Sequence, residues 1–593
     1  MLEIKEYELL NSLIKLKIKC TQRQVAEKFS MSLGKVNQIV RKLCEQQLIQ
    51  IGSDNVFQIT ERGVAALEPY KVHNAIIMAA GMSSRFAPLS YEKPKGLLKV
   101  KGEILIEREI RQLHEAGIDD ITVVVGYMKE KFFYLEEKFG VKIIVNEDYY
   151  RFNNTSTLIR VTEQLSNTYI CSSDNYFVDN VFEPYVFKPY YSAVYAAGET
   201  DEYCLECDNK GRIKNVKIGG VDSWYMLGHV YFDHNFSKKF VQILKEEYVK
   251  EETRSQLWEN LYMRHMNELC LYIRKYEADK VLEFDSLDEL RAFDQAYINN
   301  TDSKIMKNIC RVLQCEDRDI VNIKAIKAGL TNTSFRFSVG DKDYVYRHPG
   351  KGTENYINRK SEAFSMEVAA ELKLDNTFIY IDEQEGWKIS YFVQNARELD
   401  YHNSSEVAAA ISMMRTLSQE KRKSEYNFDI WKRAMEFVER LQEEQKSDFD
   451  DFLNLENLMK QLYSYIEKDT TEKCLCHCDC YSPNFLFDDE NNLYLIDWEY
   501  SGNDDPASDL GTFICCSDYS YEEAVATIEQ YHDGKVDGKI LAHYLGYVSI
   551  ASYYWYLWAL YQETMGKHVG EYLYIWYKNS KFYAKKAIEM YEL

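Results

Sequence analysis

The stretch from His477 to Asp509 limits the fold and chemistry of this chain more than any other part of the sequence. Asp479 follows the histidine by two residues, Asn484 comes five residues later, and Asp497 ends an apolar run typical of a buried strand. An Asp at the first position can accept the proton of an attacking hydroxyl, while the later Asn and Asp can hold Mg²⁺ on nucleotide phosphates. Carboxylates that merely cap turns are the alternative, but three groups at this spacing favour a phosphoryl-transfer site.

The residues that follow Asp497 separate this stretch from the protein kinases. They read Trp498-Glu499-Tyr500, where protein kinases carry Phe-Gly. In this form the stretch resembles the small-molecule kinases of the choline kinase and aminoglycoside phosphotransferase superfamily. The resemblance covers residues 303–593 and implies an α+β, bilobal, protein-kinase-like domain. It also implies that Asp479 is the catalytic base and that Asn484 and Asp497 bind Mg²⁺.

The same resemblance implies a nucleotide site and a choline site. The turn Gly329–Ser334 is similar to the phosphate loop of choline kinases, and Arg347 and Glu362 stand where kinases place an ion pair near the phosphates. The residues implied for the nucleotide are Thr331, Asn332, Arg347 and Glu362. Those implied for choline are Trp555, Trp558, Glu499, Tyr521 and Tyr574, with Tyr519 and Tyr577 as alternatives. The two indoles lie three residues apart on one helical face, a spacing that is also typical of a hydrophobic core.

Length, charge and cysteine content limit the number of domains, the partners and the cellular compartment that fit this chain. A chain of 593 residues is too long for a single hydrophobic core, and its net charge of −22 opposes general affinity for nucleic acids or anionic membranes. No apolar run approaches the roughly 18 residues that a membrane span needs. Because the acidic N-terminus shows no secretory segment, the 14 cysteines are expected to be reduced thiols of a cytoplasmic protein. Zinc bound at Cys204 and Cys207, or among Cys474–Cys480, is the less favoured alternative.

A second motif lies in residues 72–302. The strand Asn74–Ala80 runs directly into G-M-S-S-R-F-A-P-L-S-Y-E-K-P-K-G. Small residues let backbone N–H groups approach a triphosphate, and Arg85 and Lys95 supply positive charge where phosphoryl charge develops. Strands and helices alternate beyond the motif, which predicts a parallel sheet with a ligand crevice at its carboxyl edge. The combination closely resembles the signature of sugar-phosphate and alcohol-phosphate nucleotidyltransferases.

Within that superfamily the nearest likeness is to bacterial phosphocholine cytidylyltransferases of the Lic type, through S-R-F-x-P-L-S, P-K-G-L-L-K-V and E-F-D-S-L. The likeness implies an α/β domain with a Rossmann-like mixed sheet, in which Arg85 and Lys95 are catalytic. Implied nucleotide contacts are Gly81, Met82, Ser83, Ser84, Asn153, Asn154 and Ser156, and implied Mg²⁺ ligands are Asp174 and Asp285. Ser83 stands where many members carry a second glycine.

Phosphocholine carries a quaternary ammonium group, which aromatic faces and carboxylates hold because it has no hydrogen to donate. The candidates for such a site in the transferase are Tyr203, Trp224, Trp258 and Glu283, together with Glu202 and Tyr225. Ordinary packing in the core or at the rim is the alternative for each aromatic side chain.

Residues 1–70 predict a small α+β winged helix. Apolar residues recur at helical spacing over Glu3–Lys17, Thr21 caps a second helix, and a third helix is followed by two short alternating strands. This resembles the winged helix-turn-helix domains of bacterial regulators. The third helix exposes side chains suited to DNA contacts, namely Lys35, Asn37, Gln38, Arg41 and Lys42. A docking module that no longer touches DNA remains the alternative.

The three domains together predict a bifunctional enzyme with Mg²⁺ as its cofactor. The kinase would phosphorylate choline with ATP, and the transferase would move CMP from CTP onto phosphocholine and release pyrophosphate. The resulting CDP-choline would serve phosphocholine decoration of bacterial surface polymers. Two alternatives stay open: the same reactions on ethanolamine or another amino alcohol, and a transcriptional regulator that uses the enzyme domains as sensors.

Overall fold

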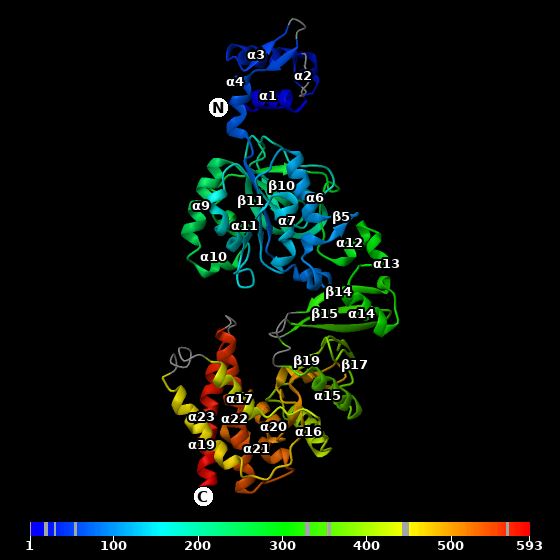
Figure 1. Ribbon diagram of the computed structural model, residues 1–593, viewed down its shortest axis with the longest axis vertical. Helices are drawn as coiled ribbons and strands as arrows, with labels where there is room; N and C mark the ends of the chain where they lie inside the picture. The colour runs from blue at the N-terminus through cyan, green and yellow to red at the C-terminus, as the bar shows by residue number, and fades with distance from the viewer. Residues whose placement is uncertain are drawn as a thin grey trace. The chain divides into compact units, whose positions relative to one another are not determined.

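The computed structural model describes residues 2–16, 22–28, 31–52, 56–326, 332–350, 353, 357–441, 450–564 and 569–593. The chain forms two compact units, Met1–Cys310 with Glu316–Arg318 and Arg311–Cys315 with Asp319–Leu593 (Figure 1). The division falls within α14 (Lys304–Leu313), close to residue 303, where we expected the kinase domain to begin. In the part of the chain that the structure describes, no helix combines the length and apolar character needed to cross a membrane.

The first unit begins with a winged helix. Its elements are α1 (Ile4–Leu16), α2 (Gln22–Lys28), α3 (Leu33–Glu45), β1 (Ile49–Ile51), β2 (Phe57–Ile59) and α4 (Glu61–Leu67). Ser32 caps α3 by accepting a hydrogen bond from the Lys35 backbone, and α3 buries Val36, Val40 and Leu43. The predicted cap Thr21 and residues 53–55, which connect the two predicted strands, lie outside the described residues.

The winged helix contacts the transferase domain through aromatic side chains. The Tyr7 hydroxyl on α1 donates to the Tyr185 carbonyl at 2.8 Å. The ring of Tyr7 lies 5.2 Å from that of Tyr70 and 5.1 Å from that of Phe187. This contact joins the two domains within one compact unit.

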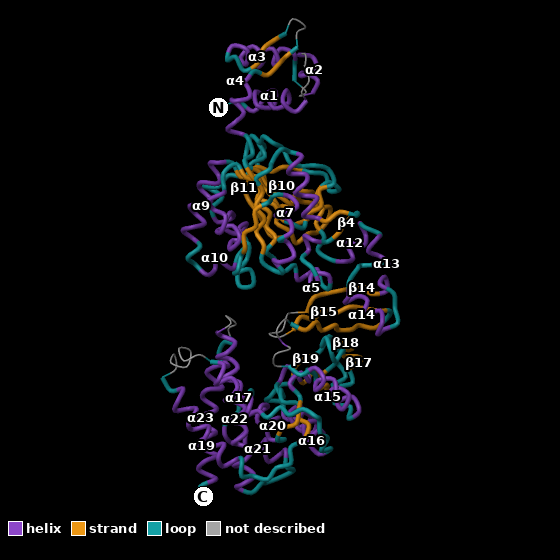
Figure 2. The backbone as a smooth tube through the Cα atoms, in the orientation of Figure 1, coloured by secondary structure: helices purple, strands orange, loops and turns teal. Residues whose placement is uncertain are grey.

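The transferase domain is built on a seven-stranded mixed sheet in the order β12-β10-β11-β8-β3-β6-β7 (Figure 2). The strands are β3 (Asn74–Ala79), β6 (Ile121–Val125), β7 (Lys142–Val145), β8 (Thr168–Ser172), β10 (Tyr190–Cys207), β11 (Ile213–Phe232) and β12 (Tyr272–Lys275). Two small ribbons pair β4 (Lys99–Val100) with β5 (Glu103–Ile104) and β9 (Asn175–Phe177) with β13 (Val281–Glu283). The helices are α5 (Leu89–Glu92), α6 (Leu105–Glu115), α7 (Tyr134–Phe139), α8 (Thr155–Leu158), α9 (His234–Glu247), α10 (Glu251–Ser255), α11 (Trp258–Arg264), α12 (Leu287–Phe293) and α13 (Ala296–Asn299).

The central strand β3 explains why this sheet forms. Helices α6 and α7 pack on the face that carries Ile77, and helices α9 and α11 pack on the face that carries Ile76. Both isoleucines are fully buried, and each such burial contributes roughly 1.5–3 kcal/mol. A strand covered on both faces needs a continuous apolar sequence, which Asn74–Ala80 supplies.

The second unit has the two lobes of a kinase fold. Its N-terminal lobe is a five-stranded antiparallel sheet in the order β14-β15-β16-β18-β17, with α15 beside it. The elements of this lobe are β14 (Ile320–Ile326), β15 (Asn332–Val339), β16 (Lys342–Pro349), α15 (Arg359–Glu371), β17 (Phe378–Ile381) and β18 (Lys388–Tyr391). Asn358 caps α15 by accepting from the backbone N–H groups of Lys360 and Ser361.

The C-terminal lobe is mainly helical and carries two small sheets. Its helices are α16 (Ser404–Gln419), α17 (Ile430–Arg440), α19 (Phe452–Ile466), α20 (Ala507–Cys515), α21 (Tyr521–Tyr531), α22 (Gly538–Thr564) and α23 (Tyr572–Tyr591). The strands are β19 (Arg397–Glu398), β20 (Cys474–Cys476), β21 (Phe485–Phe487), β22 (Leu493–Leu495) and β23 (Gly502–Asp504). The cysteines that alternate around His477 are buried free thiols, as the sequence predicted.

A buried histidine joins two segments of this lobe. His543 on α22 lies between Asp469, at 2.8 Å from Nδ1, and Asp505, at 3.0 Å from Nε2. Burial alone would lower the pKa of His543, but hydrogen bonds and attraction from the two carboxylates raise it above the ordinary value. This ion network therefore stabilises the fold most when the imidazole is charged.

Replacing His543 by alanine is expected to lower the free energy of unfolding by about 3 kcal/mol near pH 6, because two buried carboxylates lose their shared cation. The stabilisation is complete below the unfolded pKa of about 6.5 and is lost as pH rises through the raised folded pKa, so the difference should shrink toward about pH 9. Urea unfolding at about pH 6 and about pH 9 measures this difference in the free energy of unfolding. Replacement of the exposed His402 by alanine is the matched control. An equal loss at both pH values would contradict this assignment.

Candidate active sites

The transferase pocket lies at the carboxyl ends of β3 and β8. The two strands pair in parallel, with Met78 opposite Ser172, so the loop after β3 lies beside Asp174. The pocket has a volume of about 530 Å³. Its lining includes the predicted residues Gly81, Met82, Ser83, Ser84, Lys95, Asn153, Asn154 and Asp174. The expected crevice at the carboxyl edge of the sheet is therefore present.

Lys95 is the buried cation of this pocket. Its ammonium group lies 2.9 Å from Asp174 and 3.4 Å from Glu283. Burial would lower the pKa of Lys95, but the two carboxylates raise it above the ordinary value. Burial and the neighbouring Asp174 raise the pKa of Glu283 to about 8. One lysine thus lies beside two carboxyl groups.

Two further predicted charges lie at the edge of this cluster. Arg85 is largely exposed, and its guanidinium lies 3.8 Å from Asp285. Burial and the negative charge of Asp285 raise the pKa of Glu202, so the Glu202 carboxylate interacts with this cluster. The group therefore contains more carboxylates than cations.

Ser83 adopts φ +47°, in the left-handed region that favours glycine. The serine accepts a backbone conformation that costs about 1 kcal/mol. Gly96 is also needed for space, because a Cβ there would lie 2.9 Å from Ser173. Ser156, by contrast, is fully buried and donates to the Asn153 carbonyl at 2.7 Å. It supports the pocket wall and does not line the pocket.

The predicted aromatic box of the transferase does not form as expected. Trp258 is 1% exposed and stacks on Tyr191 in the core, 5.7 Å between ring centroids, so its assignment to an ammonium site was wrong. The ring of Trp224 already carries the Lys275 ammonium at 4.5 Å. The Tyr203 hydroxyl donates to Asn260 at 3.3 Å. Burial and the charges of Glu202 and Glu283 raise the pKa of Tyr225.

The donor chemistry of both sites fits Mg²⁺. Mg²⁺ prefers carboxylate oxygens and keeps several waters and substrate phosphates, so it seldom needs a cage made only of protein. The described residues contain no group of three or more His, Cys, Asp and Glu side chains that could hold a metal ion. Asp174 lines the transferase pocket and Asp497 lines the kinase cavity, and Asp285 and Asn484 would add further oxygen donors.

Asp509 stabilises the backbone of the kinase catalytic loop through hydrogen bonds. This carboxylate accepts from the backbone N–H groups of His477 at 2.9 Å and Cys478 at 2.7 Å, so its role is structural. Asn484 donates to the side chain of Asp479 at 3.0 Å. Burial and the nearby Asp497 raise the pKa of Asp479 well above its ordinary value, so the carboxylate is more basic than a free one.

An ion network connects the predicted nucleotide residues of the kinase. Arg347 donates to Glu362 at 2.8 Å and lies 3.6 Å from Asp497. Lys388, which the sequence reasoning missed, lies 3.5 Å from both Glu362 and Asp497. Arg359 adds a third cation, 3.0 Å from Glu362. The buried Glu362 therefore positions three cations, and its pKa falls to about 2 because their attraction outweighs burial.

A cavity of about 600 Å³ next to this network suits a nucleotide. Arg347, Lys388 and Asp497 line this cavity, together with the segment Phe392–Ala396 after β18. Sequence patterns gave no sign of this segment. The predicted phosphate-loop residue Thr331 lies outside the described residues.

The two predicted indoles of the kinase meet other aromatic rings. The ring centroids of Trp555 and Trp558 on α22 are 5.6 Å apart in an edge-to-face arrangement. Tyr500, three residues after Asp497, lies 6.1 Å from Trp555. Trp576 on α23, which the sequence reasoning missed, lies 6.0 Å from Trp555. These four rings are called the aromatic group below.

Three predicted choline residues do not join the aromatic group. Glu499 belongs to the ion network, since it accepts from Asn332 at 2.7 Å and lies 3.7 Å from Arg347. The ring of Tyr521 packs against Phe582, 6.1 Å away. Tyr574 lines a separate cavity of about 450 Å³. Helical geometry explains the last case, because Tyr574 and Trp576 point to different sides of α23.

Family comparisons match the three domains in order. The winged helix-turn-helix DNA-binding model matches residues 2–50, the MobA-like NTP transferase domain matches residues 75–198, and the choline/ethanolamine kinase model matches residues 323–549. A solved structure of choline kinase LicA from Streptococcus pneumoniae is similar to the kinase unit, with 22% identity and a TM-score of 0.40. That likeness covers 49% of this chain and 97% of the other.

Two relatives match the transferase domain over nearly their whole length. Choline-phosphate cytidylyltransferase from Streptococcus pneumoniae is 32% identical over 225 residues, which is 38% of this chain and 98% of that protein. The 2-aminoethylphosphonate cytidylyltransferase from Lancefieldella rimae is 37% identical over 230 residues, or 38% of this chain and 93% of that protein. Through this domain the chain belongs to the cytidylyltransferase family that includes choline-phosphate cytidylyltransferase, joined here to a winged helix and a choline/ethanolamine kinase domain.

Proposed function

We propose that the chain makes CDP-choline in two steps, first phosphorylating choline with ATP and then transferring CMP from CTP to phosphocholine. The observation that carries the proposal is the presence of two clusters of charged side chains in one chain. Lys95 with Asp174 and Glu283 forms one, and Asp479 beside the Arg347–Glu362 network forms the other. The kinase and nucleotidyltransferase families generally use Mg²⁺, which would neutralise phosphate charge at both sites.

In the kinase step, Asp479 would accept the proton of the choline hydroxyl as its oxygen attacks the γ-phosphate of ATP. The raised pKa of Asp479 favours this transfer. Arg347 and Lys388 would hold the phosphates, since both cations line the nucleotide cavity. Glu362 would keep these cations in place without touching the substrate.

In the transferase step, a phosphate oxygen of phosphocholine would attack the α-phosphate of CTP and displace pyrophosphate. Lys95 and Arg85 would stabilise the charge that develops on the phosphoryl oxygens. The loop Gly81–Ser84 would place backbone N–H groups beside the triphosphate. No covalent intermediate with the protein is needed.

The aromatic group supports choline as the kinase substrate, because aromatic faces attract a quaternary ammonium. Replacing Trp558 by leucine is expected to raise the KM for choline about tenfold with little change in kcat, which corresponds to loss of one cation–π contact. The KM for ethanolamine should rise less, since its ammonium can hydrogen-bond elsewhere. Steady-state kinetics with both alcohols measure this. Trp431→Leu, which removes an indole stacked on Tyr463 elsewhere in the domain, is the matched control.

Ethanolamine is the second candidate, and the transferase site favours it. The carboxylates of Glu202, Glu283 and Asp285 gather near Tyr225, whereas the predicted indoles lie elsewhere. Carboxylates accept hydrogen bonds that a primary ammonium can donate and a quaternary one cannot. A direct competition assay, with choline and ethanolamine at equal concentration, decides between the two. A CDP-ethanolamine product in excess of CDP-choline would overturn the choline assignment.

We also propose that the winged helix binds duplex DNA through the exposed face of α3. Lys35 and Arg41 are exposed there, although Arg41 pairs with Glu45 at 2.9 Å and Lys42 pairs with Glu3 at 2.8 Å. Replacing Lys35 and Arg41 by alanine should weaken binding to the promoter of its own operon and lower the salt slope by about one per residue. A gel shift over a salt series tests this, with Lys5→Ala as control. Absence of any shift at low salt would contradict it.

A further inference from the structure

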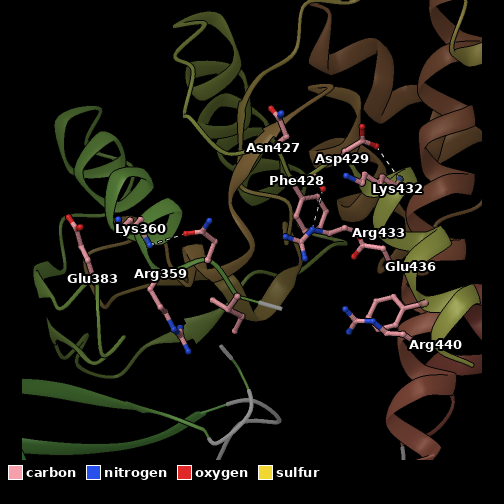
Figure 3. A pocket seen from close by; sticks show the side chains of 13 residues that line it. Arg359, Lys360, Glu383, Asn427, Phe428, Asp429, Lys432, Arg433, Glu436 and Arg440 are labelled. Carbon is pink, nitrogen blue, oxygen red and sulfur yellow. Dashed lines mark hydrogen bonds between the residues drawn. The ribbon is translucent and has the colours of Figure 1, made fainter. Parts of the chain in front are cut away.

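A basic cavity lies in the kinase domain, apart from the nucleotide cavity. It has a volume of about 670 Å³ and lies between the start of α15 and helix α17 (Figure 3). Five cationic side chains line it: Arg359, Lys360, Lys432, Arg433 and Arg440. Three acidic side chains line it: Glu383, Asp429 and Glu436. Five against three leaves an excess of two positive charges.

The excess remains when two paired groups are set aside. Arg359 pairs with Glu362 at 3.0 Å, and Asp429 pairs with Lys473 at 3.2 Å. The other side chains of the lining still comprise four cations, Lys360, Lys432, Arg433 and Arg440, and two acids, Glu383 and Glu436. This concentration of positive charge is a local feature, because the whole chain carries a net charge of −22.

Two guanidinium groups are held on the wall formed by α17. Arg433 donates to the Phe428 carbonyl at 3.2 Å and lies over the ring of Phe428 at 4.7 Å. Arg440 lies over the ring of Phe437 at 5.9 Å. In Figure 3 both guanidinium groups extend from α17 toward the space between the two helices. Stacking limits their freedom, so less rotamer entropy is lost when they bind a ligand.

The charge of the cavity selects its ligand. A quaternary or primary ammonium would meet a positive excess and be repelled. A phosphate chain carries several negative charges and accepts paired hydrogen bonds from guanidinium groups. The described residues that line this cavity and those that line the nucleotide cavity beside Asp497 do not overlap. The basic cavity therefore offers an anion site distinct from the one at which ATP would react.

We propose that the cavity binds a phosphate-chain anion, either pyrophosphate or the triphosphate of a nucleotide. Both are available to this chain under the proposed function, because the transferase step consumes CTP and releases pyrophosphate. Binding next to Arg359, which contacts Glu362, connects the cavity to the ion network of the kinase. The site would thus let the kinase domain respond to the supply or the products of the second step.

Isothermal titration of the full chain with pyrophosphate, and separately with CTP, tests the proposal. The variant Lys432→Gln/Arg440→Gln should weaken one binding event about tenfold, since two charge-assisted contacts are lost. The unmodified chain and the variant keep the same two catalytic sites. A difference in affinity between them therefore comes from the cavity alone. The control Lys421→Gln/Lys423→Gln removes the same charge from exposed lysines paired with Glu472 and should leave both titrations unchanged.

The two titrations, with pyrophosphate and with CTP, identify the source of the phosphate chain. A loss confined to the pyrophosphate titration assigns the site to released product, and a loss confined to CTP assigns it to the nucleotide. Unchanged affinity for both ligands in the cavity variant, or equal loss in the control, would overturn the proposal. The titrations need no turnover, so failure of the proposed reactions would leave this result readable.

Discussion

Replacing Asp479 by asparagine is expected to lower kcat of the kinase step roughly 10²- to 10⁴-fold, the range for loss of a general base. The amide keeps the size of the carboxylate but cannot accept the substrate proton. It also keeps a partner for Asn484, which donates to Asp479 at 3.0 Å, so the loop should hold its shape. ADP release with choline and saturating ATP measures the loss.

The same variant should leave the transferase step unchanged. Supplied phosphocholine and CTP should give CDP-choline at the wild-type rate, since Asp479 belongs to the other compact unit. Asp518→Asn, which alters an exposed acid of the kinase domain, is the matched control for charge. Full kinase activity in Asp479→Asn would remove this residue from the catalytic role.

Replacing Lys95 by methionine is expected to lower kcat of the transferase step roughly 10²- to 10³-fold, as does loss of one donor that stabilises developing charge. The substitution also leaves Asp174 and Glu283 without their cation, 2.9 and 3.4 Å away in the wild type. Loss of one partner from a buried ion pair costs roughly 3–5 kcal/mol, so folding must be measured beside activity.

Lys95→Arg separates the two effects. It keeps the positive charge and most of the stability, but the larger guanidinium cannot occupy the position of the ammonium group. Activity should therefore stay low in the arginine variant while thermal stability returns toward the wild type. Lys99→Met, at an exposed position on β4, controls for charge. A folded Lys95 variant that lost both half-reactions would contradict the account of two separate sites.

Local motifs predicted the parts of the sites that are close in sequence. The strand β3 and its loop could be predicted because an apolar run followed by small residues is compatible with few other local structures. The catalytic loop could be predicted because Asp479, Asn484 and Asp497 are fixed by short spacings. Fusion of three domains was likewise evident from three motifs in order, and the family models confirm it.

Contacts set by strand register and helix packing could not be predicted. Lys388 joins Arg347 only because β16 and β18 pair with these two residues opposite each other. Trp576 reaches Trp555 only because α23 packs on α22. The long hairpin of β10 and β11 also orders the transferase aromatics, since neighbouring residues of a strand face opposite sides. Trp224 and Tyr225 therefore could not both face the carboxylates.

The most direct test of the central claim is phosphorus NMR of the unmodified full chain with choline, ATP, CTP and Mg²⁺ in one tube. The account predicts that phosphocholine appears first and that CDP-choline and pyrophosphate then accumulate while ATP is converted to ADP. Omission of CTP should stop the reaction at phosphocholine. A tube in which phosphocholine forms but is never converted to CDP-choline, or in which no choline product forms at all, would contradict the claim that this one chain carries out both reactions.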